Sequence, residues 1–229
     1  MRPARGNLRL FLLATAILSA LPGATAAAPD AAPAVAEAKK RWSQSAHGPM
    51  LERILPPGFE TGQLPQPESR GAQLMLQYCV QCHNLPNPAM HQAGKWPTVL
   101  DRMVVRMQGK GNMGTLMRDM MAGVAAPSEE ETKFLRAYLK RNALTPLDPK
   151  KVPGIYTPQA QSFRLACQQC HALPDPQRYT AQQWPAVVAR MEKNMAWMNR
   201  VVGNRTDPTE PQLRVDEIID FLVRNAKKG

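Results

Sequence analysis

Four cysteines and two histidines carry the side chains best suited to chemistry, and they occur as two Cys-x-x-Cys-His motifs. The first motif runs from Cys79 to His83, and the second runs from Cys167 to His171. Each motif opens a stretch of 29 residues, and the two stretches share 14 identities at a constant offset of 88 residues. Self-similarity at a fixed offset indicates a duplicated structural unit. The same chemistry is therefore expected twice in this chain.

Three kinds of thiol chemistry are poorly suited to this spacing. Two tight cysteine pairs would be a poor disulfide framework for a chain of 229 residues. A zinc site with four cysteines usually separates its pairs by ~15–20 residues, whereas 84 residues lie between Cys82 and Cys167. A thioredoxin-like redox pair needs a βαβ context, and the sequence shows none.

Covalent attachment of haem c is the remaining interpretation, because Cys-x-x-Cys-His is its recognised signature. Two thiols about one helical turn apart can reach the two vinyl groups on one porphyrin edge, and the next side chain brings an imidazole beneath the iron. The sequence therefore predicts two haem c groups. The thioether bonds would come from Cys79, Cys82, Cys167 and Cys170, and the proximal iron ligands would be His83 and His171.

The distal iron ligand is expected to be methionine in both units. Tyr179 stands where His91 would repeat, and His47 lies in a Pro-rich segment, so neither histidine offers a ligand common to both units. All four cysteines are already assigned, which leaves His/Met coordination. Two methionine pairs repeat without a gap, namely Met103/Met191 and Met107/Met195.

A Trp-Pro pair precedes these methionines and suits the first turn of a helix. Methionines 7 and 11 residues after Trp96 and Trp184 fall on one helix face, which is expected to lie against the haem. Each tryptophan is expected to anchor the core and to pack on the haem or bond to a propionate. Pro86 and Pro174, which follow the motifs, are expected to turn the chain along the haem edge. A proline carbonyl there would accept from the proximal imidazole.

These features resemble the tandem di-haem class I c-type cytochromes, in the organisation of the cytochrome c4 group. In such domains the first and last helices cross at a small residue eight positions before the first cysteine and an aromatic residue four positions before it. The corresponding residues are Gly71 and Met75, facing Tyr138, and Gln159 and Phe163, facing Phe221. The resemblance covers about residues 66–229 and does not extend to the preceding segment.

The resemblance also ranks the methionines. In short class I domains with a similar pattern, the methionine seven residues after the tryptophan is the distal ligand. This resemblance makes Met103/Met191 the first choice and Met107/Met195 the second. In longer cytochromes the ligand lies on a loop after this helix, which would instead select Met113 or Met117, and Met198.

The predicted fold is all-α, with two tandem class I cytochrome c domains that each wrap one covalent haem c. No segment shows the alternation or β-branched enrichment of strands, and each unit ends in a helix with a capping pattern at its start. The expected organisation is a signal peptide at 1–26, a Pro/Ala-rich lead-in at 27–65, domain one at 66–145, a linker at 146–158 and domain two at 159–229.

The N-terminus predicts export, because three arginines precede an apolar run of twelve residues and a small-residue tract. That run is short for a spanning helix, so no membrane anchor is expected after cleavage. The formal net charge is +11, yet no run of basic residues with stacking aromatics indicates nucleic acid. Steering towards an acidic or membrane-bound redox partner and a simply solvated basic surface are equally compatible with this charge.

The function expected from these features is electron transfer by an exported, periplasmic di-haem cytochrome rather than catalysis. The alternative is an electron-transfer subunit of a di-haem oxidoreductase, or such an enzyme itself. The lead-in around Leu51–Leu55 is expected to be a spacer, with a docking role as its alternative.

Overall fold

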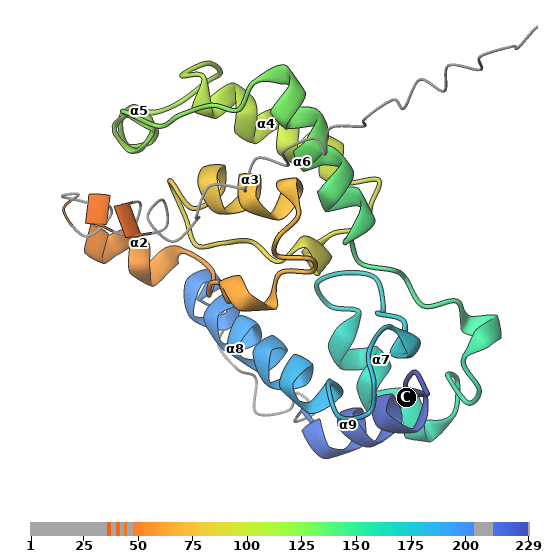
Figure 1. Cartoon of the computed structure of the whole chain (residues 1–229). Helices are drawn as coiled ribbons and strands as arrows, with labels where there is room; N and C mark the ends of the chain where they lie inside the picture. The colour runs from red at the N-terminus through yellow and green to blue at the C-terminus, as the bar shows by residue number, and fades with distance from the viewer. Residues whose placement is uncertain (1–35, 38–39, 42–43, 45–47, 204–212, 229) are drawn as a thin grey trace, which may run out of the picture.

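The computed structural model describes residues 36–37, 40–41, 44, 48–203 and 213–228 (Figure 1). The predicted signal peptide and His47 lie outside these residues. Within them the chain is helical, and β-structure is limited to three isolated bridges. The all-α prediction is therefore confirmed. Among the helices described, none combines the length and apolar character needed to cross a membrane.

Eight α-helices and five short 3-10 helices are described. The α-helices are α2 (Gly48–Ile54), α3 (Arg70–Tyr78), α4 (Trp96–Met107), α5 (Thr115–Met121), α6 (Glu129–Arg141), α7 (Gln161–Cys167), α8 (Trp184–Val202) and α9 (Val215–Arg224). The 3-10 helices are η1 (Thr61–Gln63), η2 (Pro88–Met90), η3 (Pro149–Lys151), η4 (Pro158–Ala160) and η5 (Pro176–Arg178).

The helices form two units, each with its own apolar core. In the first unit α3 and α4 pack against α6, and in the second unit α7 and α8 pack against α9 (Figure 1). The first core centres on Leu74, Met75, Leu135 and Leu139, and the second centres on Phe163, Trp184, Phe221 and Leu222. The sequence duplication is thus also a structural duplication.

The first and last helices of each unit cross closely, as expected. A Cβ atom added to Gly71 would lie 2.3 Å from the Cβ of Tyr138, so only glycine allows this approach of α3 to α6. In the second unit the rings of Phe163 and Phe221 stack with centroids 5.0 Å apart. Gln159 does not take part, because it is exposed.

The small residue at the second crossing is Ala160 instead. Ala160 is completely buried, and its helix η4 packs against α9. Its counterpart at the 88-residue offset, Ala72, is equally buried in the first unit. The expected position was therefore one residue too early, because the second unit begins this segment with a tighter 3-10 turn.

The repeat begins well before residue 66. The Phe59 N–H donates to the Leu85 carbonyl at 2.9 Å, and at the same offset the Leu147 N–H donates to the Leu173 carbonyl at 2.7 Å. Helices η1 and η3 follow at equivalent positions, and each precedes a buried core side chain, Leu64 or Val152.

A shared turn completes this equivalence. Gln66 and Gly154 occupy the same place and have φ values of 50° and 72°, a conformation that is unusual for glutamine. Residues 59–65 and 147–158 therefore make equivalent contacts in the two units, outside the ranges 66–145 and 159–229 expected for the domains. The structure also differs from a simple spacer before residue 59, because Gly48–Ile54 is helical and the Asn84 side chain donates to the Pro56 carbonyl.

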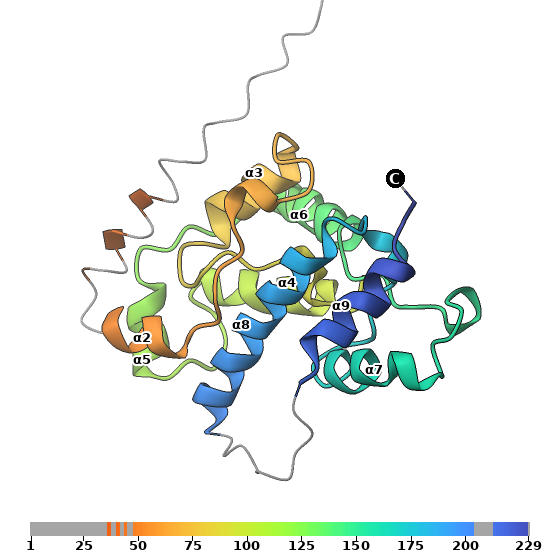
Figure 2. The same ribbon diagram turned by 90° about the horizontal axis from the view of Figure 1, so that it is seen from below.

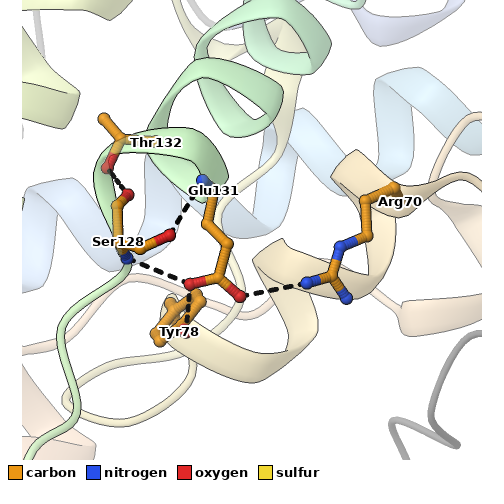
Figure 3. Close-up of polar contacts among 5 residues, drawn as sticks. All are labelled: Arg70, Tyr78, Ser128, Glu131 and Thr132. Carbon is orange, nitrogen blue, oxygen red and sulfur yellow. Dashed lines mark hydrogen bonds and ion pairs between the residues drawn. The ribbon is translucent and has the colours of Figure 1, made fainter.

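The start of α6 carries the predicted capping box (Figure 3). The Ser128 Oγ accepts from the Glu131 N–H, and the Glu131 carboxylate accepts from the Ser128 N–H. The same carboxylate accepts from the Tyr78 hydroxyl at 2.8 Å and pairs with Arg70 at 3.0 Å. One glutamate therefore caps α6 and ties it to both ends of α3.

The two units are joined by side chains of the second that reach the first. Arg178 donates to the Asn142 carbonyl and to the Thr145 Oγ1, both at 3.1 Å. The Arg190 guanidinium on α8 lies 5.2 Å from the centre of the Phe59 ring. In Figure 1 α8 lies between α9 and the first unit, and in Figure 2 α8 passes in front of α4 with α9 beside it.

Candidate functional site

Both Cys-x-x-Cys-His motifs begin where the first helix of a unit ends. Cys79 is the C-cap of α3, and Cys167 is the last residue of α7. The chain continues as turns and bends through both histidines. A Leu-Pro-x-Pro segment follows each motif, at Leu85–Pro88 and Leu173–Pro176. It does not continue the helix, because proline lacks an N–H and disfavours helical backbone angles in the residue before it. Each motif is thus held on a turn whose start is fixed by a packed helix.

The two motif histidines have the same orienting contact. His83 Nδ1 lies 2.7 Å from the carbonyl oxygen of Asn84, and His171 Nδ1 lies 2.8 Å from that of Ala172. A carbonyl at this distance holds the proton on Nδ1 and leaves Nε2 as the free lone pair. The expected acceptor was a proline carbonyl, whereas the structure uses the carbonyl of the next residue.

The two tryptophans anchor the chain in an identical way. The Trp96 indole N–H donates to the Pro88 carbonyl at 2.8 Å, and the Trp184 indole N–H donates to the Pro176 carbonyl at 2.9 Å. Both rings are buried. These bonds show the expected core-anchor role directly. Because they use the only indole donor of each ring, that donor is not free for a propionate. Packing of the rings on a haem stays a prediction. Pro86 and Pro174 are half-buried beside the motifs.

His91 and Tyr179 occupy equivalent places against these tryptophans. Each ring meets its tryptophan edge to face with centroids 5.1 Å apart. Burial lowers the pKa of His91, and the positive charge of Lys95 lowers it further.

The methionines predicted as ligands lie on α4 and α8. Met103, Met107, Met191 and Met195 are all half-buried. Met107 packs against the core of the first unit, as expected of a side chain that fills space. Met113 is buried in the loop before α5, and Met117 is half-buried on α5.

Met198, which the pattern of longer cytochromes offered as an alternative ligand, makes a contact with the second motif. Its Sδ lies 3.9 Å from the Sγ of Cys170. Met198 lies on α8 rather than on a loop after it, and residues 191, 195 and 198 share one helix face by their spacing. This contact shows that the methionine face of α8 reaches the second motif.

Three of the four thiols are poor nucleophiles and poor ligands for a bare metal ion, because their pKa values are raised. Burial raises the pKa of Cys79 and of Cys167 to about 12, with a smaller effect of the neighbouring cysteine. Burial also raises the pKa of Cys82 to about 11, opposed by the charge of Arg41. Redox-active cysteine pairs need a lowered pKa, so this environment disfavours a thioredoxin-like site. All four cysteines are free.

The donor set suits a haem better than a zinc ion. The two motifs belong to different units, and within the described ranges no three His, Cys, Asp or Glu side chains cluster. Haem c instead needs two thiols, one oriented imidazole and a soft distal donor in each unit, and these residue types are present in both. Two buried donors on α8, Arg190 Nε and Trp197 Nε1, have no hydrogen-bond partner in this part of the structure, and they could serve an anionic group such as a propionate.

Two surface hollows lie apart from both motifs. One, of about 520 Å³, lies between α4 and α6. The other, of about 470 Å³, lies where α9 ends beside η3 and is lined by Lys151, Arg224, Lys227 and Lys228 among others. The motif residues line neither hollow, so the candidate site is defined by the motifs and the methionine faces.

Comparison of the chain with protein-family models, curated proteins and solved structures gave no match.

Proposed function

We propose that the protein is an exported di-haem c-type cytochrome that carries single electrons between periplasmic or membrane-bound redox partners. The observation that supports this most is the repeated hydrogen bond of the motif histidines, at 2.7 Å and 2.8 Å. A disulfide motif gives no reason for each histidine to be held with a free Nε2 in both units, whereas a metal ligand requires it. A zinc ion is disfavoured for a separate reason, because no three His, Cys, Asp or Glu side chains cluster among the described residues.

Each unit would hold its cofactor through the same set of residues. Cys79 and Cys82 in the first unit would add their S–H bonds across two vinyl groups, and Cys167 and Cys170 would do so in the second. The bound iron would supply one-electron redox chemistry, with Met ligation favouring a high potential. The burial of Leu74 and Trp184 would exclude water from the two sites.

Haem content tests this proposal directly. The protein expressed in a bacterial periplasm with the haem c maturation system should carry two covalent haems in a pyridine haemochrome assay. Replacing Cys79 and Cys82 by alanine should leave one haem, as should replacing Cys167 and Cys170. A wild-type protein with no covalent haem would reject the proposal, and a five-coordinate, ligand-binding ferric iron would favour the oxidoreductase alternative.

The distal ligands are proposed to be Met103 and Met191, which repeat without a gap in both units. Met103→Ala and Met191→Ala should each remove half of the far-red Fe(III)–Met absorption band. Met107→Ala and Met195→Ala are the matched controls, and both should keep it. Because Met198 Sδ lies close to Cys170, Met198→Ala is included for the second unit. If that variant loses the band and Met191→Ala keeps it, the ligand assignment is wrong.

A further inference from the structure

The two motifs contain the same glutamine in different surroundings. Gln81 and Gln169 both precede the second cysteine of their motif. Gln81 is buried with 8% of its surface exposed, whereas Gln169 is exposed. The neighbouring cysteines follow the same division, because Cys82 is buried and Cys170 is exposed. Among the described residues, the duplicated sequence has therefore produced one covered motif and one motif with exposed side chains.

The first motif is covered by the segment that follows α5. The Gln81 side chain donates to the Ala125 carbonyl and accepts from the Ala125 N–H, both at 2.9 Å. From the N-terminal side, Arg41 donates to the Gly123 carbonyl at 3.2 Å, and its charge acts on Cys82. The paired Gln81 amide and the half-buried Arg41 thus hold this segment over the first motif.

The second motif faces the surface beside exposed apolar and basic groups. The Gln169 side chain folds back onto the Leu165 carbonyl at 3.1 Å, and Leu165 itself is 47% exposed. On the adjacent residue, the Arg164 guanidinium lies 5.7 Å from the centre of the Tyr156 ring, and this ring is 72% exposed. Exposed apolar side chains next to an arginine are typical of a protein-binding surface.

We propose that the second motif, with Leu165, Arg164 and Tyr156, is the surface at which electrons enter and leave this protein. This inference rests on the proposed electron-transfer function. One electron would pass from the reduced iron of the second unit to an oxidised partner. A reduced partner would return one electron to the oxidised iron at the same surface. The first unit would exchange its electron through the second, whose Arg178 side chain donates to the Asn142 carbonyl and to Thr145 Oγ1 of the first.

The partner that fits this surface is a redox protein with an acidic rim. Residues 147–228 hold twelve Lys or Arg and eight Asp or Glu, so the second unit is cationic overall. Arg164 adds a positive charge beside the second motif, while Leu165 and Tyr156 offer apolar contact. Complementary charge of this kind raises association rates and weakens with salt.

A charge placed on this surface tests the proposal in the di-haem protein. Leu165→Glu puts an acid on the surface, and Phe134→Glu is the matched control, because Phe134 is also 47% exposed but lies on α6 of the first unit. Both variants change the net charge equally. Stopped-flow oxidation of the reduced protein by hexacyanoferrate(III) at low salt should be slowed about threefold or more by Leu165→Glu relative to Phe134→Glu. Equal rates, or a slower control, would overturn the proposal.

A second measurement uses the unaltered protein. Hexacyanochromate(III), a redox-inert paramagnetic anion, should broaden the amide NMR signals of residues 165–171 in the ferrous protein more than those of residues 77–83. Equal broadening at both motifs would also overturn the inference. Both experiments start from protein with two haems by pyridine haemochrome, so a failure of the proposed function would be recognised first and separately.

Discussion

At the scale of single residues, the same few polar contacts recur in both units and hold the motif in place. Each motif histidine is oriented by the carbonyl of the residue after it, and each buried tryptophan donates to the second proline of Leu-Pro-x-Pro. An unpaired buried carbonyl costs more than the bond itself contributes. These contacts should therefore be sensitive to isosteric changes.

Trp184→Phe should lower the free energy of unfolding by about 1–3 kcal/mol, because it leaves the Pro176 carbonyl without its donor. Urea denaturation followed by circular dichroism measures this. Trp96→Phe should behave alike in the first unit. Tyr156→Phe changes an exposed ring and should stay within about 0.5 kcal/mol of wild type. If Trp184→Phe lowered the free energy of unfolding no more than Tyr156→Phe does, the anchoring role of Trp184 would be contradicted.

At the scale of elements, the helices are held by caps and by one close crossing. The α6 cap concentrates five side-chain hydrogen-bond or ion-pair contacts on Glu131 and Ser128. The crossing of α3 with α6 depends on the absence of a side chain at Gly71. The first feature is tested by removing polar contacts, and the second is tested by adding volume.

Glu131→Gln should destabilise the protein at neutral pH by about 0.5–1 kcal/mol, through the weakened cap. The hydrogen bond from the Ser128 backbone is the main cause that lowers the pKa of Glu131 below its usual 4.5. A lowered pKa contributes stability that is present above about pH 4.5 and is lost as pH falls through the folded-state value. The difference between variant and wild type should therefore shrink in acid. A constant difference from pH 7 to pH 3 would contradict this assignment.

Gly71→Ala should destabilise the protein by about 1–3 kcal/mol or more, because the new Cβ would overlap Tyr138 and push α3 from α6. Thermal and urea unfolding would measure the loss. Gly94→Ala is the matched control, since a Cβ there meets nothing within 4 Å. Equal stability of the two variants would show that the crossing has more space than the structure indicates.

At the scale of the whole molecule, the units are similar in architecture but differ in what surrounds their motifs. Helix α8 has 19 residues where α4 has 12, and the first unit has the additional helix α5 between α4 and α6. Arg178 and Arg190 connect the second unit to the first. The interface is thus formed by polar side chains at identifiable positions.

Arg178→Ala should loosen the interface and cost about 1–3 kcal/mol, because it removes two hydrogen bonds to the end of the first unit. The two units should then unfold in separate transitions under differential scanning calorimetry. Arg136→Ala removes an exposed ion pair with Asp101 within one unit and should cost less than about 1 kcal/mol. A single unchanged transition for Arg178→Ala would show that other contacts hold the units together.

The sequence by itself determined the all-helical class, the duplication, the motif positions, the cap of α6 and the tryptophan-led helices. These follow from local patterns, namely residue spacing, capping residues and identities at one offset. The start of the repeat was missed because Phe59 and Leu147, or Leu64 and Val152, share apolar character but not identity. Their equivalence is visible only in matching backbone hydrogen bonds and burial.

Tertiary structure alone decided how the two copies differ. Gln81 and Gln169 are identical in type and place, yet one is buried against Ala125 and the other is exposed. The difference arises from segments more than 40 residues away that fold over one motif, and from the reach of Met198 towards Cys170. Such long-range contacts depend on how the helices pack and on which polar groups form hydrogen bonds when they are buried. Local sequence patterns therefore do not predict them.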